Sequence, residues 1–533
     1  MADQITIPWI IVGDFNHIIN QGENFGGNPI NQLRVDAYLS CMNACGMMDM
    51  GYVGGRYNWV NMRNGHIIRE RLDRFWCNSD CKVLFPEAIV YHLPRLISDH
   101  NPILLNFAPQ IPSFVKRPFR FEKFWFDHPE FKDIIDRIWS HPRNNTFSCL
   151  ASTTTSIKVW SRDTFGNLFK QKKVILAHLE GIHRSLSMNH SNFLFNLEKE
   201  LSQEYAEILK CEVDLWFLKS RTNWIMDGDK NSRFFHITTI KHRSHNKIHG
   251  LKNPRGEWIT DPMELNTMVT NYFSTLFSSS TTHSYHDSYT LIYSIISQPL
   301  DPSDSLVMLP SLSEIRKAFC SMKAFKAPSP DGTHPFFYQK MWHFVKDTIL
   351  TDVKQIFETS IIPPEWNECL ITLIPKVTSL ETIYQLRLIG LCNIRSKIVS
   401  KIIVHRLKPV LDSIISPCQA SFVLGRRESD NILILQELVY SFNRKIGRKG
   451  GMIIKLDLEK AYDRLEWSFI RKTLIFFQLP SSLISLIMSC ISLTSMSILV
   501  NGEATNMFLP SHGIRQETLY PLIFLSFVWN IYL

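Results

Sequence analysis

The sequence predicts a chain of several α/β and α+β domains, and three observations lead to that prediction. Its 533 residues are enough for roughly three to four domains. Short apolar runs that end in polar groups, such as 7–12 and 451–457, are typical of buried strands. Residues 194–216 carry apolar side chains at helical spacing with Glu and Lys between them, which indicates a long helix with a solvated face.

Composition places the chain among packed proteins and leaves its partners open. Hydrophobic residues make up 45% and charged residues 20%, which is ordinary for globular domains. The net charge of +9 permits a polyanionic partner without requiring one. The 11 cysteines are scattered and no secretory signal precedes them, so we expect free thiols inside the cell, in the nucleus or the cytoplasm.

The sequence favours neither a zinc site nor a membrane span. The pairs Cys41/Cys45 and Cys77/Cys81 lack the tighter repeats of zinc sites, so buried or helix-face cysteines are favoured. The uncharged stretch 483–500 is long enough for a membrane span, but Ser and Thr dilute its apolarity. It predicts a helix and then a strand that enters the Asn501-Gly502 turn, and no membrane partner.

Composition shifts divide the chain into four parts. Residues 1–108 are α/β in pattern and end before a proline-rich connection. Residues 119–277 are mostly helical and basic, residues 278–310 form a Pro- and Ser-rich linker, and residues 311–533 are again mixed α/β.

The apolar run 451–457 ends in the carboxylate of Asp457, and a turn then leads to a helix that contains Trp467 and Ile470. Two divalent ions held by carboxylates can clamp the attacking and leaving oxygens of a phosphodiester displacement. A strand end would hold such a carboxylate firmly. On spacing alone, a helix N-cap is the commoner explanation of such an aspartate.

The neighbouring motifs extend this pattern. They are, in chain order, 406–411, 415–422, Gly425-Arg426, 429–433 and 455–457. This ordered series resembles the reverse transcriptases of non-LTR (LINE-type) retrotransposons, particularly the plant forms. The resemblance implies right-hand polymerase fingers and palm, with an RNA template, a DNA target or primer and deoxynucleotide triphosphates as partners. It also implies Mg²⁺ or Mn²⁺ as cofactor, and it leaves the oligomeric state open.

By this resemblance Asp457 is the first metal-binding aspartate of the palm, and Tyr462 is the aromatic gate that excludes a ribose 2′-hydroxyl. Lys376 and Arg387 would approach the triphosphate, where cations stabilise the developing charge. Gln516 would touch the nucleotide and the template. Packing within the palm for Tyr462, and solvated cations for Lys376 and Arg387, remain the alternatives.

The polymerase motifs also depart from the family pattern. The run 387–391 reads Arg-Leu-Ile-Gly-Leu where the family has Arg-Pro-Ile-Ser-Leu. After Gln516 the chain carries Glu517 and Thr518 where the family has Gly and Asp, and the paired aspartates expected further on are not reached before Leu533. A glutamate would bring negative charge to a phosphate-bearing ligand. We therefore expect an incomplete site and an inactive polymerase, or alternatively a non-catalytic nucleic-acid-binding remnant, so that enzyme activity is uncertain.

A second group of polar residues lies near the N-terminus. Asp14 and Asn16 follow the first strand, Asp73 lies in the run 70–74, and Asp99 precedes His100. One histidine among several carboxylates suits metal-assisted phosphodiester hydrolysis, although a lone histidine is usually structural.

This region resembles the endonuclease/exonuclease/phosphatase superfamily in the form that these retrotransposons carry, an α/β sandwich that nicks DNA. The resemblance implies that Asp14 and Asn16 hold the attacking water and the phosphate. His100 would act on the phosphate, oriented by Asp73, with Asp99 beside the metal. The family motifs that precede this strand have no counterpart here, so a partial sandwich and an inactive nuclease remnant are expected.

The middle region carries aromatic residues beside cations. Trp160 and the runs 165–167, 219–221 and 228–236 resemble the connector of the same retrotransposon proteins. Its basic cluster is the expected nucleic-acid tether, and a solvated basic face is the alternative. The cluster consists of Lys241, Arg243, Lys247, Lys252 and Arg255.

Overall fold

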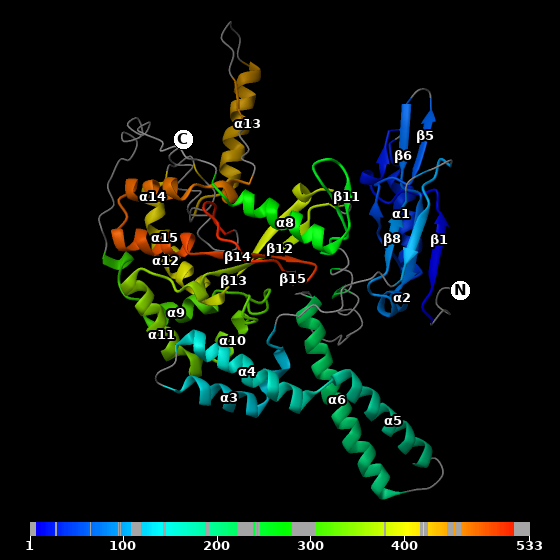
Figure 1. Ribbon diagram of the computed structural model, residues 1–533, viewed down its shortest axis with the longest axis horizontal. Helices are drawn as coiled ribbons and strands as arrows, with labels where there is room; N and C mark the ends of the chain where they lie inside the picture. The colour runs from blue at the N-terminus through cyan, green and yellow to red at the C-terminus, as the bar shows by residue number, and fades with distance from the viewer. Residues whose placement is uncertain are drawn as a thin grey trace.

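The computed structural model contains both helices and sheets, as the sequence predicts (Figure 1). It describes residues 7–515 apart from internal gaps. The gaps are 27–28, 64–65, 94, 96–97, 108–118, 142–144, 187–190, 221–237, 240–241, 243–245, 280–303, 378–379, 416–418, 420–424, 445–451 and 455–459.

In its described residues, the N-terminal part contains short strands, the helices α1 and α2, and a short helix of a single turn. The helices are α1 (Gln32–Ala44) and α2 (Ser79–Leu84). The strands are β1 (Ile10–Asp14), β2 (Asn24–Phe25), β3 (Met47–Asp49), β4 (Val53–Gly54), β5 (Trp59–Arg63), β6 (His66–Glu70), β7 (Asp73–Asn78), β8 (Ile89–His92) and β9 (Ile103–Asn106), together with the short helix η2 (Gln21–Glu23).

These strands form three three-stranded sheets, in the orders β1-β7-β3, β2-β6-β5 and β4-β8-β9. The first strand, expected over 7–12, begins at Ile10 and runs to Asp14. Strand β7 lies in the middle of its sheet, antiparallel to both neighbours. The buried cluster under these sheets includes Cys77 and Cys81, so this cysteine pair has the buried position that the sequence favoured.

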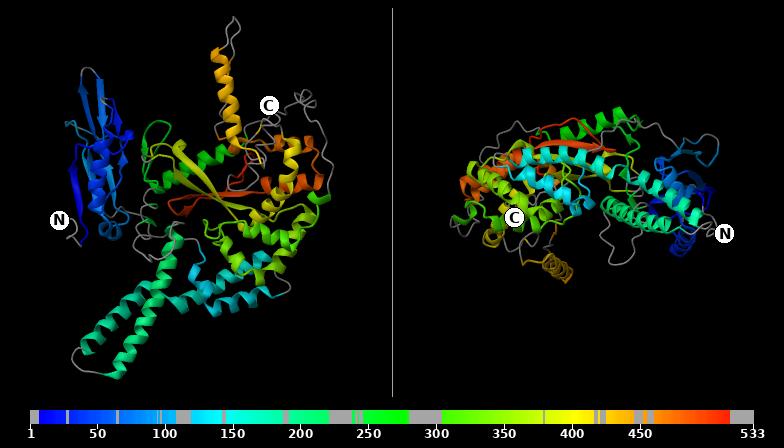
Figure 2. Two further views of the ribbon diagram at one scale, coloured as in Figure 1. Left: turned by 180° about the vertical axis from the view of Figure 1, so that it is seen from behind. Right: turned by 90° about the horizontal axis from the view of Figure 1, so that it is seen from below.

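The helical region begins with η3 (Lys123–Asp127), α3 (Pro129–Trp139) and α4 (Thr146–Phe165). Helices α5 (Leu168–Leu186) and α6 (Asn192–Ser220) then form a long hairpin that extends away from the rest of the molecule (Figure 2). The helix predicted over 194–216 is confirmed within α6. A small hairpin, β10 (Leu251–Lys252) and β11 (Trp258–Ile259), precedes α8 (Pro262–Leu276).

The C-terminal part combines helices with one sheet of order β13-β12-β14-β15. Its strands are β12 (Glu368–Pro375), β13 (Leu386–Cys392), β14 (Ser495–Val500) and β15 (Glu503–Ala504). Its helices are η5 (Asp304–Leu306), α9 (Leu312–Cys320), α10 (Pro335–Lys340), α11 (Trp342–Thr359), η6 (Pro364–Trp366), η7 (Ile383–Gln385), α12 (Ile394–Ile414), α13 (Glu428–Arg444), η8 (Ala461–Arg464), α14 (Trp467–Phe476) and α15 (Ser481–Ser492).

The largest hydrophobic core joins the helical region to the C-terminal part. Buried residues of η3, α3 and α4, including Phe131 and Ile157, belong to the same cluster as residues of α9–α12, α14 and α15. Gly332 illustrates the close contact: its φ is +82°, and a Cβ there would lie 2.2 Å from the carbonyl oxygen of Phe119. Helix α8 packs in a second core against β12, β13 and β14. The helical region is thus packed onto the C-terminal part along its length from η3 to α4 and again at α8.

Two expectations from the C-terminal half have different outcomes. The run 483–500 forms α15 and then β14, with the Asn501-Gly502 turn at positive φ, so the predicted helix and strand are confirmed. No helix in the described ranges is long and apolar enough to cross a membrane. Of the expected strand 451–457, residues 451 and 455–457 lie outside the described residues; residues 452–454 pair with no strand in the described chain, and Met452 is 79% exposed.

Candidate active sites

The polar residues of the N-terminal part converge from three places in the chain. Strand β1 ends at Asp14, which lies directly opposite Asp73 in the antiparallel pairing with β7. His100 Nδ1 lies 2.8 Å from Asp73 Oδ2, and its Nε2 lies 4.0 Å from Asp14 Oδ2. An isolated β-bridge between Trp59 and His100 holds this loop beside β5. The two aspartates therefore flank one imidazole ring.

The surroundings of His100 favour its protonated form. Burial alone would lower its pKa, but the hydrogen bond and charge of Asp73, with Asp14 and Asp99 nearby, raise the pKa above its ordinary value. Because the side chain is 31% exposed, a ligand can reach it. An imidazolium fixed by a carboxylate at Nδ1 can hold a phosphate oxygen or donate a proton through Nε2.

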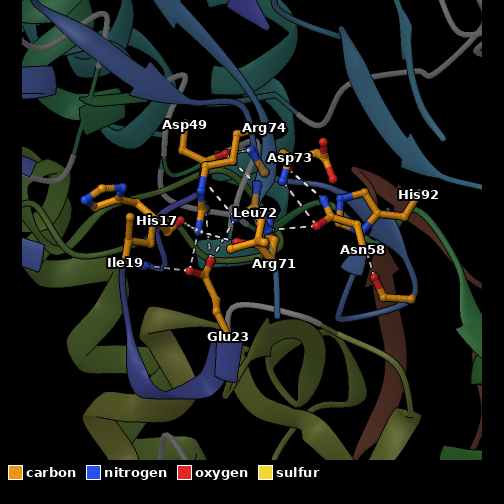
Figure 3. Close-up of polar contacts among 12 residues, drawn as sticks. His17, Ile19, Glu23, Asp49, Asn58, Arg71, Leu72, Asp73, Arg74 and His92 are labelled. Carbon is orange, nitrogen blue, oxygen red and sulfur yellow. Dashed lines mark hydrogen bonds and ion pairs between the residues drawn. The ribbon is translucent and has the colours of Figure 1, made fainter. Parts of the chain in front are cut away.

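Asp73 is held in place by Asn58, which is fully buried. The Asn58 Oδ1 accepts hydrogen bonds from the backbone nitrogens of Leu72 (2.8 Å) and Asp73 (3.2 Å). Its Nδ2 donates to the Asp73 carbonyl oxygen at 2.7 Å (Figure 3). Asparagine at this position thus positions the aspartate that contacts His100, a role that the sequence comparison with the superfamily did not assign.

Asp73 also lies between two buried arginines that sequence reasoning missed. Arg71 forms ion pairs with Glu23 (2.9 Å) and Asp49 (2.9 Å), and Arg74 pairs with the same two carboxylates at 2.5 and 2.8 Å (Figure 3). Burial alone would raise the pKa of Asp49, but Arg71 and Arg74 hold it below its usual range. This four-charge network fixes the start of β7. In the sequence, the signal for this network was the presence of two arginines, Arg71 and Arg74, on either side of the candidate Asp73.

The remaining two predicted residues lie at the edge of this group. Asn16 follows β1 with φ +51°, and its backbone nitrogen donates to Asp14 Oδ1 at 2.9 Å. Asp99 accepts a hydrogen bond from Trp59 Nε1 at 3.0 Å, which lowers its pKa. In the part of the chain that the structure describes, no three His, Cys, Asp or Glu side chains are grouped closely enough to hold a metal ion. The metal role of Asp99 therefore stays a prediction.

In the C-terminal part, Lys376 and Arg387 lie on one hairpin. Lys376 directly follows β12, and its backbone nitrogen donates to the Gln385 carbonyl oxygen at 2.8 Å. Arg387 lies on β13 opposite Ile374. Both side chains are exposed. Strand β13 pairs without interruption through Leu388, where the family has proline, so this departure leaves the hairpin intact.

Tyr462 lies on η8, and Gly513 to Arg515 pack against this short helix. The Tyr462 carbonyl oxygen accepts from the Ile514 backbone nitrogen at 2.8 Å, and Gly513 nitrogen donates to the Leu465 carbonyl oxygen at 2.8 Å. Gly513 has φ +83°, and a Cβ there would lie 2.6 Å from the Asp463 carbonyl oxygen. Burial raises the pKa of Tyr462. Two motifs separated by about fifty residues thus form one structural unit.

Arg515 anchors the unit formed by η8 and Gly513 to Arg515 to neighbouring elements of the fold. Its side chain is buried and donates to Asn367 Oδ1 at 2.5 Å and to the Cys490 carbonyl oxygen at 2.7 Å. These bonds join the segment to the end of α15 and to the residue before β12. Arg515 directly precedes Gln516, the residue that the family resemblance assigned to the nucleotide and the template. In the structure it holds the motif in place instead of facing a ligand.

Lys460 links the hairpin to η8. This residue precedes η8 in the left-handed conformation (φ +53°), and its Nζ donates a hydrogen bond to the Tyr272 hydroxyl of α8. The ammonium lies 4.8 Å from the Tyr272 ring centroid and 5.7 Å from that of Tyr384. The Tyr384 carbonyl oxygen accepts from Lys376 Nζ at 3.3 Å. Lys376 and the turn that carries Tyr462 are therefore joined through one tyrosine.

Several predicted residues cannot be placed or have partners of their own. Asp457, Gln516, Lys241 and Arg243 lie outside the described residues. In the rest of the basic cluster, Lys247 pairs with Glu87 of the N-terminal part, and Lys252 pairs with Glu381 at 2.7 Å. Arg255 lies in the exposed turn between β10 and β11. The described part of the cluster is thus partly neutralised by acidic neighbours.

The chain contains a reverse transcriptase segment. Residues 374–526 match the family described as reverse transcriptase (RNA-dependent DNA polymerase), and this range includes the last two residues of β12, all of β13, η8 and Gly513 to Arg515. The chain is also 23% identical over 484 residues to the transposon TX1 uncharacterized 149 kDa protein of Xenopus laevis. That match covers 86% of this chain and 36% of the relative, so the chain spans about a third of the relative's length. The two matches are thus to a reverse transcriptase family and to a protein named as a transposon protein.

Proposed function

We propose that this chain is part of a LINE-type retrotransposon polyprotein of plant type, with right-hand polymerase fingers and palm in residues 311–533. The observation that carries the proposal is the unit formed by the β12–β13 hairpin, η8 and Gly513 to Arg515. Lys460 and Tyr384 join the hairpin cation to the turn that carries Tyr462. The reverse transcriptase match over residues 374–526 begins within β12 and contains β13, η8 and Gly513 to Arg515.

In this proposal the chain's own residues bind and orient the substrates. Lys376 and Arg387 neutralise triphosphate charge, which cations do best when they are held in advance. Tyr462 packs against the incoming sugar, so that a deoxynucleotide is preferred. An RNA template and a DNA primer lie along the same surface. Divalent Mg²⁺ or Mn²⁺, held by Asp457, would supply the charge that activates the primer hydroxyl.

The departures from the family pattern support a binding role without synthesis. Glu517 and Thr518 replace a glycine and an aspartate beside the proposed nucleotide position. A glutamate there repels the triphosphate and blocks close backbone approach. The non-catalytic nucleic-acid-binding remnant, acting inside the cell, is therefore the form of the proposal that this sequence favours.

Primer extension on an RNA template, in Mg²⁺ or Mn²⁺, tests this form directly. We expect the purified chain to bind an RNA–DNA template–primer and to extend no primer. Extension that disappears in Asp457→Ala would overturn the inactivity and establish the polymerase. A folded chain that binds no nucleic acid at any salt concentration would contradict both forms.

One observation supports a second function in the N-terminal part. Asp14 and Asp73 flank a partly exposed His100 whose pKa is raised, an arrangement that suits phosphodiester hydrolysis. We propose that residues 1–108 are the DNA-nicking endonuclease/exonuclease/phosphatase part of the polyprotein. Nicking of supercoiled plasmid with Mg²⁺ that is lost in His100→Ala and kept in His66→Ala, an exposed histidine on β6, would support this function. It would also overturn the expected inactivity. If the folded chain does not nick the plasmid, the contacts among Asp14, Asp73 and His100 have a structural role and the nuclease proposal is wrong.

A further inference from the structure

Helix α12 presents a line of cations at its surface. From Ile394 to Leu407 every side chain is buried except Lys397, Lys401, His405 and Arg406, and the exposed Lys408 follows. The spacing of Lys397, Lys401, His405 and Lys408 places them on one face of the helix, over about 16 Å.

Arg406 has a separate, structural task. It forms a bidentate ion pair with Glu314 of α9 at 2.7 and 2.9 Å, and it donates to the Met308 carbonyl oxygen at 2.6 Å. Glu314 is the acidic group of α9 that faces this side of α12, and its charge is taken up by this pair. The positive charge of the remaining line is therefore not cancelled by it.

Neighbouring elements add to the same positive surface. Lys401 donates a hydrogen bond to Ser321 Oγ at 2.8 Å, at the end of α9. Burial lowers the pKa of Lys401, and the charges of Lys408, Lys326 and Lys397 lower it further. Burial likewise lowers the pKa of His405, with Lys401, Lys408 and Lys317 acting in the same direction. These cations are close enough to repel one another.

An open groove of about 600 Å³ lies along the adjoining face of α9. Its lining consists of Leu312, Ser313, Arg316, Lys317, Cys320 and Trp342. Trp342 stands edge-on to the buried Phe319 at 5.7 Å between ring centroids and remains partly exposed. Cys320 lines the groove and the next residue, Ser321, accepts the hydrogen bond from Lys401, so the groove adjoins the line of cations.

We propose that this α9–α12 surface binds a single-stranded nucleic acid. Its phosphates would follow Lys397, Lys401 and Lys408, while a base enters the groove against Trp342. Aromatic faces beside a line of cations are the combination that binds single strands without reading their sequence. Like charges four residues apart weaken an isolated helix, and a polyanion relieves this repulsion. None of the residues of this surface belongs to the β12–β13 hairpin or to η8, the elements on which the proposed polymerase site rests.

Fluorescence anisotropy of the full chain with labelled oligo(U) and oligo(dT) at 50 to 200 mM salt tests the proposal. In Lys317→Gln/Lys401→Gln/Lys408→Gln we expect binding to weaken at least tenfold at the lower salt. The slope of log affinity against log salt should become shallower by about two, since each single-strand phosphate contact contributes roughly 0.7. The relative affinity for the two oligonucleotides assigns RNA or DNA.

The matched control changes the same charge elsewhere. Lys132→Gln/Lys173→Gln/Lys199→Gln removes three exposed lysines of α3, α5 and α6 and should leave the slope unchanged. Trp342→Leu should weaken binding about fivefold or more with the slope unchanged, because stacking carries no charge. An unchanged slope in the α9–α12 variant, or an equal loss in the control, would overturn the proposal. So would displacement of the oligonucleotide by polyglutamate as efficiently as by unlabelled RNA.

Discussion

The substitution Glu23→Gln tests how the N-terminal part holds its candidate aspartate in place. Glu23 is 5% exposed, and its carboxylate pairs with Arg71 and Arg74 while it also accepts from the Ile19 backbone nitrogen at 2.9 Å. Glutamine keeps the shape but removes the charge. Two buried guanidinium groups then face the single carboxylate of Asp49.

The expected loss is about 3 kcal/mol in the free energy of unfolding of this part of the chain. Breaking a buried ion pair by removing one partner typically costs about 3–5 kcal/mol, because a buried charge is left uncompensated. The lower value applies because glutamine can keep one hydrogen bond to an arginine. Typical domains are stable by about 5–15 kcal/mol, so the loss is large for a region with so small a core.

Hydrogen exchange of a peptide that covers β7, with and without urea, measures the effect where it is expected. Glu358→Gln, on the exposed face of α11, is the matched control and should change nothing in β7. Adding Arg71→Gln to Glu23→Gln restores charge balance, so the double variant should be more stable than the sum of the single effects by about 1 kcal/mol or more. A loss below about 1 kcal/mol, or strict additivity, would refute the network as the support of β7.

Three further predictions follow from the two sites. In NMR titration the His100 ring should titrate above its ordinary pKa of 6.5, and Asp73→Asn should lower that pKa; since the folded-state pKa is raised, the stabilisation is complete below pH 6.5 and is lost as the pH rises through the folded value. Gly513→Ala should lower the thermal midpoint and should cost about 2 kcal/mol or more in the free energy of unfolding. Gly256→Ala is the comparison, because Gly256 also has a positive φ but an added Cβ would meet no atom within 4 Å; it should cost about 1 kcal/mol. Arg515→Met should cost about 3 kcal/mol in urea unfolding, because it leaves buried carbonyl and amide oxygens without a donor; a loss below 1 kcal/mol would contradict the anchoring role.

Local patterns were enough to predict the elements whose periodicity is strong. The helical spacing of 194–216 and the division of 483–500 into a helix and a strand are both confirmed, because amphipathic period and turn residues act over short distances. The run 451–457 has an equally strand-like composition, but its described residues 452–454 pair with no strand in the ranges that the structure describes. Composition can indicate that a segment suits a sheet, but pairing depends on a neighbour supplied by the fold.

The candidate sites likewise depend on contacts between residues that are far apart in the sequence. The sequence grouped Asp14, which follows an apolar run, with Asp73 and His100 as one histidine among several carboxylates, and the structure brings these three residues together. The residues that support them were not predictable, because Glu23 and Arg74 meet only through contacts 51 positions apart. Lys460 and Tyr272 are 188 positions apart. Such pairs carry no local signal in a single sequence.

Site-specific crosslinking tests most directly the central claim that residues 311–533 carry a polymerase-type nucleic-acid site. An RNA–DNA template–primer with a photoreactive nucleotide at the primer 3′ end would be bound to the full chain, irradiated and mapped by peptide mass spectrometry. We predict crosslinks in the peptides that contain Lys376 to Arg387 and Lys460 to Glu466, reduced in Lys376→Ala/Arg387→Ala and unchanged in Lys132→Ala. Crosslinks confined to α9 and α12 or to residues 247–255, with none at the hairpin or η8, would contradict the claim.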